Sequence, residues 1–396
     1  MKVLQICSKP PLPEIDGGCK AMNSITQGML NLGVEVKILT LSTQKHPFNS
    51  NQLASDYLNS TQIETTYVDT TPNPISAALN LLSSKSYNLE RFNVKEFDNK
   101  IAAELTKNSY DVVLLEGLYV SMYLDTIRGF SSAKVIYRAH NIESEIWHRN
   151  VAESKGLKRW YLNQLAKKLE IKEKLVLNNF DGIAAISEKD KKKLVEIGCN
   201  VPVDVFPFGV DLEKYQSVAL TNKNSIFHIG SMEWLPNQHG VNWFIDKVWS
   251  VLSKKYENLQ FYLAGKNMPQ KLKNAANGNL FVLGEVDDAI DFINHNSIMI
   301  VPIFAGSGMR IKIIEGMALK KTVIATSIAA EGINCSSGVN IIIADTAKEF
   351  IEAIEQCLAD NQYTTSIGEA AKKLVASSYD NKVIVNNLVE FFKQLN

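Results

Sequence analysis

The residues best able to do chemistry lie in the segment 306–318, GSGMRIKIIEGMA. Its first four residues, Gly306, Ser307, Gly308 and Met309, are predicted to form a loop between an apolar strand and a helix. Backbone N–H groups at the start of such a helix can hold phosphate oxygens, because the helix dipole places partial positive charge there. The segment therefore predicts an anion-binding site.

Three charged residues follow this loop. Arg310 and Lys312 fall in the first turn of the predicted helix, where the dipole favours acidic residues instead. Two cations at this place indicate that an anion is expected in front of them. Glu315 lies one turn further along, where its carboxylate could accept hydrogen bonds from ribose hydroxyls. A solvated helix start with unrelated charges is the alternative.

Polar residues also gather in RAHNIES, at the end of a predicted strand in the first half of the chain. Arg138, His140, Asn141 and Glu143 are expected to lie at the lip of a crevice. A lone histidine is more often structural than catalytic, so the functional interpretation of His140 depends on its position after the strand.

Gly17–Gly18 closes the loop between the first predicted strand and helix. Without side chains, these residues let backbone N–H groups approach an anion or a sugar, and a tight turn is the alternative. The sequence contains neither the G-x-G-x-x-G pattern of dinucleotide-binding folds nor a Walker A loop.

The segment 155–174 holds seven basic and two acidic residues and predicts an amphipathic basic helix. Its apolar stripe consists of Leu157, Tyr161, Leu165 and Leu169, four residues apart. Such a helix usually has a solvated face over a packed stripe. Peripheral contact with an anionic membrane surface or a lipid diphosphate is the alternative.

The composition excludes several classes of protein. A balance of 42 Lys+Arg against 42 Asp+Glu lacks the basic excess of a nucleic-acid binder. Five scattered cysteines, with no C-x-x-C or D-x-D motif, argue against a disulfide framework, a metal site or a metal cofactor. No stretch is as apolar as a spanning helix or a signal peptide requires. We therefore expect a cytoplasmic protein, peripheral at most to the inner face of a membrane.

The elements that position these residues alternate between strands and helices. Apolar runs at 2–7 and 34–41 flank a predicted helix at 19–32, which makes a βαβ unit and implies a parallel sheet. Further strands are expected at 111–117, 133–140, 181–187, 225–231, 259–265, 279–285, 297–303 and 321–327. Helices such as 240–256 and 311–319 separate them.

This pattern predicts an α/β protein of two similar halves joined near 203–212. The expected domains are 1–205 and 206–379, with the C-terminal segment 380–396 packing back on the first. Open parallel sheets bind ligands in the crevice at the carboxyl ends of their strands. The polar and glycine-rich segments described above follow predicted strands at these ends.

Seven segments, taken in order, resemble glycosyltransferase family 4 (glycosyl transferases group 1): PPLPEIDGG, NLGVEVKILT, AAISEKDKKKL with FPFGVD, FHIGSMEWLPN, FVLGEVDD and GSGMRIKIIEGMALKKTVIAT. The resemblance implies a GT-B fold, two Rossmann-like, doubly wound parallel-sheet domains facing across a cleft. It also implies retaining transfer of a sugar from a nucleoside-diphosphate sugar, held mainly by the second domain. The implied acceptor, held mainly by the first domain, is a glycan or a polyprenyl-diphosphate-linked chain.

The resemblance assigns roles to particular positions. Glu315 matches the second glutamate of the family's E-x7-E motif, which binds the donor ribose. Ser307 stands where the first glutamate would touch the donor sugar. Val286 is implied to present backbone groups to the base and Gly17–Gly18 to face the diphosphate. His140 matches a histidine near the donor sugar.

The family's arginine and lysine for the diphosphate are missing. Ser231 follows Gly230, and Asn237 lies near the place of the lysine. Our hypothesis is that Arg310 and Lys312 supply the displaced positive charge.

Two other functions stay open at this stage. A sugar-nucleotide epimerase of the same fold would need an acid–base group beside the sugar, for which His140 with Glu116 or Glu143 is the nearest set. A non-catalytic nucleotide-sugar-binding subunit is the alternative from a different class.

Overall fold

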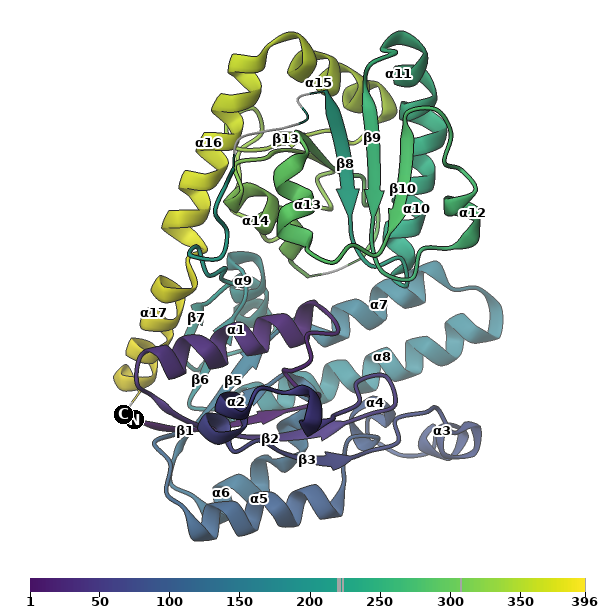
Figure 1. Ribbon diagram of the computed structural model, residues 1–396. Coiled ribbons are helices and arrows are strands. Elements are labelled where there is room, and N and C mark those ends of the chain that lie inside the picture. Colours follow the sequence, from purple (N-terminus) through teal and green to yellow (C-terminus); the bar gives the residue numbers. More distant parts are fainter. Residues whose placement is uncertain (219–221, 223, 307, 396) are drawn as a thin grey trace. The chain divides into compact units, whose positions relative to one another are not determined.

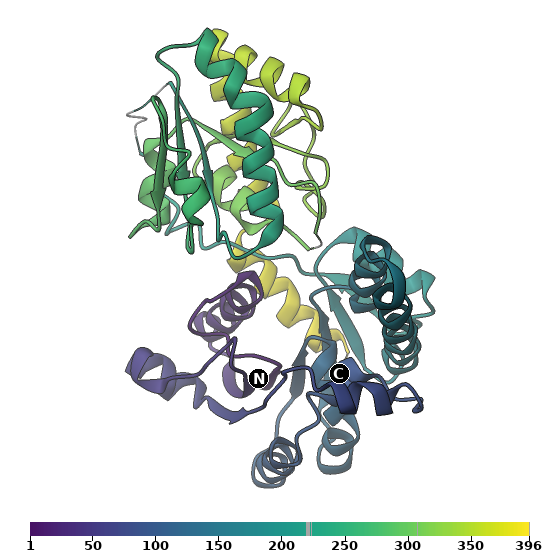
Figure 2. The same ribbon diagram turned by 90° about the vertical axis from the view of Figure 1, so that its right-hand side faces the viewer.

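The computed structural model describes residues 1–218, 222, 224–306 and 308–395, so Ser307 lies outside the described residues. Strands and helices alternate along the chain (Figures 1 and 2), as the apolar runs predicted. Contacts divide the chain into two compact units, which are described separately below.

The first unit comprises Met1–Gly209 and Lys382–Asn396, and the second unit comprises Val210–Asn381. The sequence analysis placed its two changes of domain at 205–206 and 379–380. The segment around Val210 is held in the second unit, because its N–H donates to the carbonyl of Tyr379 at 2.8 Å.

The first unit contains one parallel sheet in the order β3-β2-β1-β4-β5-β6-β7. Its strands are β1 (Lys2–Cys7), β2 (Glu35–Ser42), β3 (Glu64–Tyr67), β4 (Val112–Glu116), β5 (Lys134–Ala139), β6 (Gly182–Ala185) and β7 (Val203–Val205). β2 and β3 lie on one side of β1, and β4, β5, β6 and β7 lie on the other side. The carboxyl ends of β1 and β4 therefore flank a topological switch point, where open sheets of this kind bind ligands.

The second unit repeats this plan with a parallel sheet in the order β10-β9-β8-β11-β12-β13. Its strands are β8 (Ser225–Ile229), β9 (Gln260–Ala264), β10 (Leu280–Gly284), β11 (Ile298–Val301), β12 (Thr322–Ala325) and β13 (Ile342–Ile343). The switch point of this sheet lies between β8 and β11. The first six strands of the two sheets thus share one order. The sequence predicted two similar halves, but not this order.

Helices cover the sheets. In the first unit they are α1 (Gly17–Asn31), α2 (Ser55–Thr61), α3 (Pro74–Asn80), α4 (Tyr87–Glu90), α5 (Lys95–Lys107), α6 (Leu124–Phe130), α7 (Glu143–Glu153), α8 (Gly156–Leu177) and α9 (Glu188–Glu196), with 3₁₀ turns at Ser50–Gln52 and Leu118–Tyr123. In the second unit they are α10 (Leu235–Phe244), a π turn at Ile245–Trp249, α11 (Ser250–Lys255), α12 (Gln270–Lys273), α13 (Ala289–His295), α14 (Ile311–Ala318), α15 (Ala347–Ala359) and α16 (Asn361–Ser378).

Both faces of the first sheet are buried, which explains why its strands are continuous apolar runs rather than alternating ones. Leu4 and Ile6 of β1 belong to one hydrophobic core, whereas Val3 and Cys7 of the same strand belong to the other. Such two-sided burial is typical of parallel sheets with helices on each face.

The last helix, α17 (Asn381–Gln394), packs on the first sheet although it follows the second unit in sequence. Val385, Leu388 and Phe392 of α17 are buried in the core that contains β1 and β2. A β-carbon at Gly182 of β6 would lie 2.6 Å from Leu395, so glycine allows the C-terminal segment to approach this strand. Figure 1 shows α17, in yellow, beside β6 and β7.

Three strands were not predicted: β3, β7 and β13. They are short strands near or at the edges of their sheets, and β3 (ETTY) buries only Thr66. The predicted helix at 240–256 begins earlier, at Leu235, and contains a π turn. Within the described part of the chain, no helix has the length and apolar character needed to cross a membrane.

Candidate active site

The predicted site residues follow the strands that flank the two switch points. In the first unit, Gly17 begins the helix after β1, Glu116 is the last residue of β4, and His140 follows β5. In the second unit, loops after β8 and β11 carry Gly230 and Gly306. Each unit therefore presents its polar residues at the strand ends where the fold binds ligands.

Lys312 is the centre of the group in the second unit. Its Nζ donates to Oδ1 of Asn237 at 2.9 Å, and Nδ2 of Asn237 donates to the carbonyl of Ser231 at 2.7 Å. A β-carbon at Gly230 would lie 2.3 Å from this ammonium, so glycine is what admits Lys312 to the end of β8. The ammonium of Lys312, on α14, thus reaches the loop after β8. This is the loop in which the arginine and lysine expected from the family resemblance are missing.

Burial and the neighbouring charge of Arg310 lower the pKa of Lys312 to about 7, although Glu315 acts in the opposite direction. His228 lies behind the ammonium, with Nε2 3.5 Å from Nζ of Lys312 and Nδ1 donating to the carbonyl of Ile300. Burial and the charge of Lys312 keep the pKa of His228 well below its usual value. The group is therefore short of negative charge and suited to an anion.

Arg310 is the N-cap residue of α14 and is almost fully buried. Its guanidinium lies 5.2 Å from the ring centroid of Trp234, and its Nη1 donates to the carbonyl of Gly308. A β-carbon at Gly306, whose φ is +113°, would lie 2.7 Å from the same indole. Trp234 thus packs against both Gly306 and Arg310. Met309, which lies between these two residues in the sequence, is half-buried.

Glu315 and Val286 lie in the second unit as well. Oε1 of Glu315 accepts a hydrogen bond from the phenol of Tyr215 at 2.7 Å. Val286 follows β10 and lines an open pocket of about 620 Å³ together with Tyr262 and Asp288.

In the first unit, Glu116 is fully buried at the end of β4. It accepts hydrogen bonds from His140 Nε2 at 2.6 Å, from Gln5 at 2.8 Å and from Arg138 at 3.3 Å. Burial alone would raise the pKa of Glu116, but the Arg138 guanidinium and the hydrogen bond from His140 outweigh it and lower the pKa to about 2. Burial lowers the pKa of His140, so this imidazole is neutral and its Nε2–H donates to the carboxylate.

Arg138 does not lie at the lip of a crevice, where the sequence analysis placed it. It belongs to β5, has no exposed surface, and pairs with Glu116 in the neighbouring strand. Its Nη1 also contacts the carbonyl of Ala21 at 3.4 Å. The residue keeps Glu116 ionised rather than meeting a substrate directly, because a side chain this deep does not reach solvent.

Glu143 begins α7 and is partly buried. Burial and the nearby Glu173 raise its pKa to about 7, against the hydrogen bonds from the Tyr119 phenol at 2.9 Å and from Asn141. The Glu173 carboxylate, from α8, accepts the backbone N–H groups of Glu143 and Ser144. The first turn of α7 is therefore already capped by an acid.

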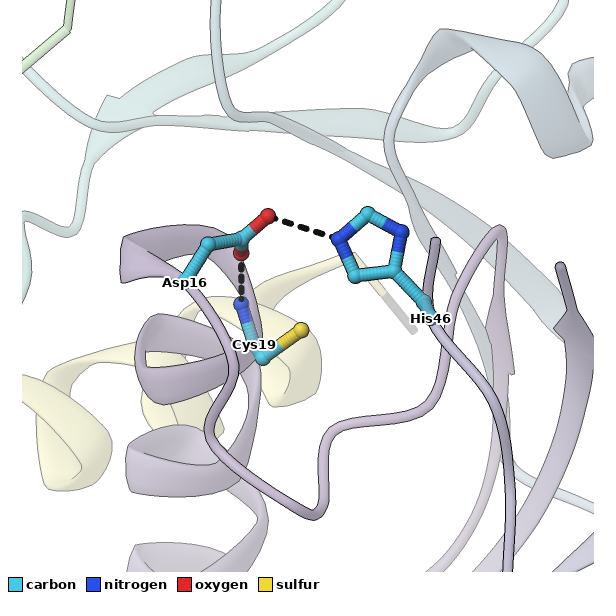
Figure 3. A group of neighbouring side chains, drawn as sticks. All are labelled: Asp16, Cys19 and His46. Atoms are coloured by element: carbon cyan, nitrogen blue, oxygen red, sulfur yellow. Dashed lines mark hydrogen bonds and ion pairs between the residues drawn. The ribbon is translucent and has the colours of Figure 1, made fainter. Parts of the chain in front are cut away.

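Asp16, Cys19 and His46 form a group whose potential metal-ligand atoms lie within 4.8 Å of one another (Figure 3). Asp16 caps α1 by accepting the N–H of Cys19 at 3.0 Å, and its other oxygen contacts His46 Nε2 at 2.8 Å. Lys9 Nζ lies 2.7 Å from both carboxylate oxygens, so an ammonium already neutralises Asp16.

Burial raises the pKa of the Cys19 thiol to about 11, which keeps it protonated. Because the Lys9 ammonium already contacts both oxygens of the one carboxylate in this group, the group fits an ion-paired helix cap better than a metal site. Gly18 belongs to the same arrangement, because a β-carbon there would lie 2.8 Å from Lys9 Nζ.

The structure thus brings together Gly230, Ser231, Asn237, Arg310 and Lys312 in one group. Sequence reasoning did not identify the residues that support the two groups: Lys9, Asp16, Gln5, His46, Tyr119, Glu173, Tyr215, His228 and Trp234. The position of Lys9 and His46 just after strands was a usable signal. Asp16, His228 and Trp234 are sequence neighbours of predicted site residues, but their residue types alone did not reveal their contacts.

Two family models match the chain. The model described as Glycosyltransferase Family 4 matches residues 16–214, and the model described as Glycosyl transferases group 1 matches residues 223–360. A Klebsiella pneumoniae protein, "Uncharacterized 44.6 kDa protein in cps region", is 26% identical over 294 residues, which cover 70% of this chain and 73% of that protein.

Solved structures share the fold. HepE from Anabaena, in complex with UDP and glucose, matches with a TM-score of 0.68 and 14% identity over 98% of this chain and 99% of its own. Sucrose-phosphate synthase from Thermosynechococcus elongatus matches with a TM-score of 0.73 and 14% identity over 100% of this chain and 99% of its own. These matches confirm the GT-B fold that the sequence predicted.

Proposed function

Because the chain belongs to glycosyltransferase family 4, and so transfers a sugar from a nucleoside-diphosphate sugar, we propose the finer points of its reaction. It is a retaining, metal-independent hexosyltransferase of polysaccharide or glycoconjugate assembly. The relative from a cps region supports polysaccharide assembly as the pathway. The HepE complex with UDP and glucose supports a nucleoside-diphosphate hexose as the donor.

The observation that carries the proposal is the position of the Lys312 ammonium over Gly230, hydrogen-bonded to Asn237. Family relatives hold the diphosphate with cations from this loop, and here the loop has none. Lys312 and Arg310 bring two positive charges to the same place from α14. With the N–H groups at the start of α14, they form a preorganised site for the negative charge of a leaving diphosphate.

In the proposed reaction the bond between the donor sugar and the diphosphate breaks while the acceptor oxygen bonds to the same face of the sugar. The acceptor proton passes to an oxygen of the leaving phosphate, so no separate base is needed. Stabilising the diphosphate and the oxocarbenium-like sugar is then the main catalytic task. His140 would accept a hydrogen bond from the sugar through Nδ1, because Glu116 takes its Nε2–H.

The test compares ligands that differ only in phosphate. In the variant Arg310→Gln/Lys312→Gln, we expect binding of UDP, GDP or ADP, whichever binds best, to weaken on the order of 100-fold, and binding of the corresponding nucleoside to change little. Isothermal titration calorimetry measures both. Lys255→Gln, in an exposed ion pair with Glu355, is the matched control. Equal weakening of nucleotide and nucleoside binding would contradict the assignment of Arg310 and Lys312 to the diphosphate.

Acceptor binding is proposed for the first unit, with Asn141 after β5 and Glu143 at the start of α7. Because the pKa of Glu143 is about 7, both the carboxylate and the carboxylic acid are populated near neutral pH. This side chain could therefore accept a hydrogen bond from a hydroxyl of the acceptor substrate, or donate one to it. Activity that survives excess EDTA would support metal independence, for which the Lys9-neutralised Asp16 is the structural argument.

Peripheral membrane contact is proposed for 155–174, where a polyprenyl-diphosphate-linked acceptor would be met. Leu157, the first residue of the predicted stripe, does not pack as expected and is 87% exposed, and Trp160 is 55% exposed. Lys158 and Arg159 between them are exposed too. An apolar tip flanked by cations fits the interface of an anionic bilayer.

A sedimentation assay with vesicles tests this contact. The wild-type protein should bind phosphatidylglycerol vesicles and not phosphatidylcholine vesicles, and Leu157→Ser/Trp160→Ser should abolish binding. Leu283→Ser, at a residue that is 50% exposed in the second unit, is the matched control. Unchanged binding of the double variant would remove 155–174 from the proposal.

The close contact between His140 and Glu116 favours the epimerase alternative, but Glu116 does not provide the acid group that an epimerase needs. Glu116 is buried against Arg138 with a lowered pKa, so it orients His140 and does not carry a mobile proton. Incubation with a sugar nucleotide alone separates the two functions, since only an epimerase then forms a new sugar nucleotide. Tight donor binding without turnover on any acceptor would favour the non-catalytic subunit.

A further inference from the structure

Tyr215 connects the start of the second unit to the proposed ribose-binding residue. Its hydroxyl donates to Oε1 of Glu315 at 2.7 Å, across 100 residues of sequence. Tyr215 is only 7% exposed and lies in a turn in which the N–H of Tyr215 donates to the carbonyl of Leu212. The turn follows Val210, where the chain enters the second unit.

This contact restricts the carboxylate of Glu315. A glutamate side chain has three rotatable bonds, and a buried phenol at one oxygen selects among their conformations. A carboxylate has about four acceptor positions, so a hydrogen bond at Oε1 is compatible with hydrogen bonds from ribose hydroxyls. A hydrogen bond from a neutral hydroxyl to an ionised acceptor is also stronger than one between neutral groups.

We propose that Tyr215 is a positioning residue that orients Glu315 toward the ribose of the donor nucleotide. This inference rests on the proposed function, since Glu315 is assigned the ribose there. It adds the turn 211–215, outside the E-x7-E segment, to the structure that selects ribonucleotides. In the free protein the phenol holds the carboxylate ready, so less ordering remains when the nucleotide binds.

A purely structural role for Tyr215 makes a different prediction. If the phenol only anchors the turn, its removal lowers stability and leaves the discrimination between ribose and deoxyribose unchanged. The two roles are therefore separated by a ratio of affinities, not by activity.

The experiment uses Tyr215→Phe, which removes one hydroxyl and keeps the buried ring. Calorimetry measures the affinities of the best-bound nucleotide among UDP, GDP and ADP and of its 2′-deoxy and 3′-deoxy counterparts. We expect the ribonucleotide to bind on the order of tenfold more weakly to the variant. The deoxy counterpart that lacks the hydroxyl bound by Glu315 should change little, so the ratio between the two shrinks.

Tyr379→Phe is the matched control. Tyr379 is equally buried, at 3% exposure, and its hydroxyl accepts the backbone N–H of Asn334 at 2.8 Å. This variant should lose stability without changing the ratio. Glu315→Asp supplies a second test, because it withdraws the carboxylate from the phenol and leaves the turn intact. It should lower the ratio in the same direction.

Three outcomes decide the inference. A smaller ratio in Tyr215→Phe and in Glu315→Asp, with no change in Tyr379→Phe, supports it. A wild-type ratio in Tyr215→Phe overturns it and leaves the proposed function standing. If the wild-type protein binds none of the three nucleotides, the proposed function fails and this inference fails with it.

Discussion

The site residues of the two units manage charge in opposite ways. In the first unit the charges are paired within the protein: the buried Glu116 lies against Arg138 and His140, and the partly exposed Asp16 lies against Lys9 and His46. In the second unit Arg310 and Lys312 are neighbours of the same sign, and their proximity helps to lower the pKa of Lys312.

This difference in pairing distinguishes charges that hold side chains in place from charges that bind a ligand. A buried charge whose partner is part of the protein is tolerated because it is paired, and losing the partner is costly. Two like charges held together weaken the fold slightly and gain most when an external anion arrives. The first unit is therefore built to hold its side chains in place, and the second to receive a diphosphate.

The largest expected effect is the loss of the buried partner in the first unit. Glu116→Gln leaves the Arg138 charge uncompensated and should lower the free energy of unfolding by about 3–5 kcal/mol in urea titrations. Glu285→Gln, which removes an exposed ion pair with Lys266, should cost well under about 1 kcal/mol. Similar losses for the two variants would contradict the comparison.

In the second unit, Lys312→Gln should show the reverse. The amide can still donate to Asn237, while the repulsion with Arg310 is gone, so the free energy of unfolding should stay constant or rise by up to about 1 kcal/mol. Nucleoside-diphosphate affinity should fall on the order of tenfold or more. A clearly destabilised variant with unchanged affinity would reverse the roles of the two units.

The pH dependence of binding should follow Lys312. Its pKa of about 7 means that the free protein has lost about half of this charge at pH 7 and nearly all of it at about pH 9. Diphosphate affinity should therefore weaken over that range, where the nucleotide itself is fully ionised. Over the same range the unfolded chain binds more protons at this lysine, so its contribution to stability rises with pH. Both trends should vanish in Lys312→Gln, as measured by calorimetry and denaturation at each pH.

The smallest effect is expected at Asp16, whose ion pair is partly solvated. The side chains of Lys9 and Asp16 keep 25% and 34% exposure, and Asn at this position can still cap α1. Asp16→Asn should cost about 1 kcal/mol or less by thermal denaturation. A loss as large as that of Glu116→Gln would show that exposure does not distinguish the two pairs.

Much of the fold was predictable because it depends on local pattern. Apolar runs such as KVLQIC at 2–7 located β1 to the residue, since a strand buried on both faces must be apolar throughout. The edge strands β3, β7 and β13 were not predicted, because edge strands need not bury a continuous apolar run. The stripe on α8 was predicted to begin at Leu157, yet the packing begins further along, at Leu165.

The sequence by itself determined the α/β class, the two-half organisation and the segments that carry polar groups at strand ends, because these follow from periodicity and residue type. Only the tertiary structure decided which groups meet. It buried Arg138 against Glu116, brought Lys312 from α14 to Gly230, and joined Tyr215 to Glu315 across 100 residues. Such contacts depend on how strands are ordered in a sheet, and no local pattern encodes that order.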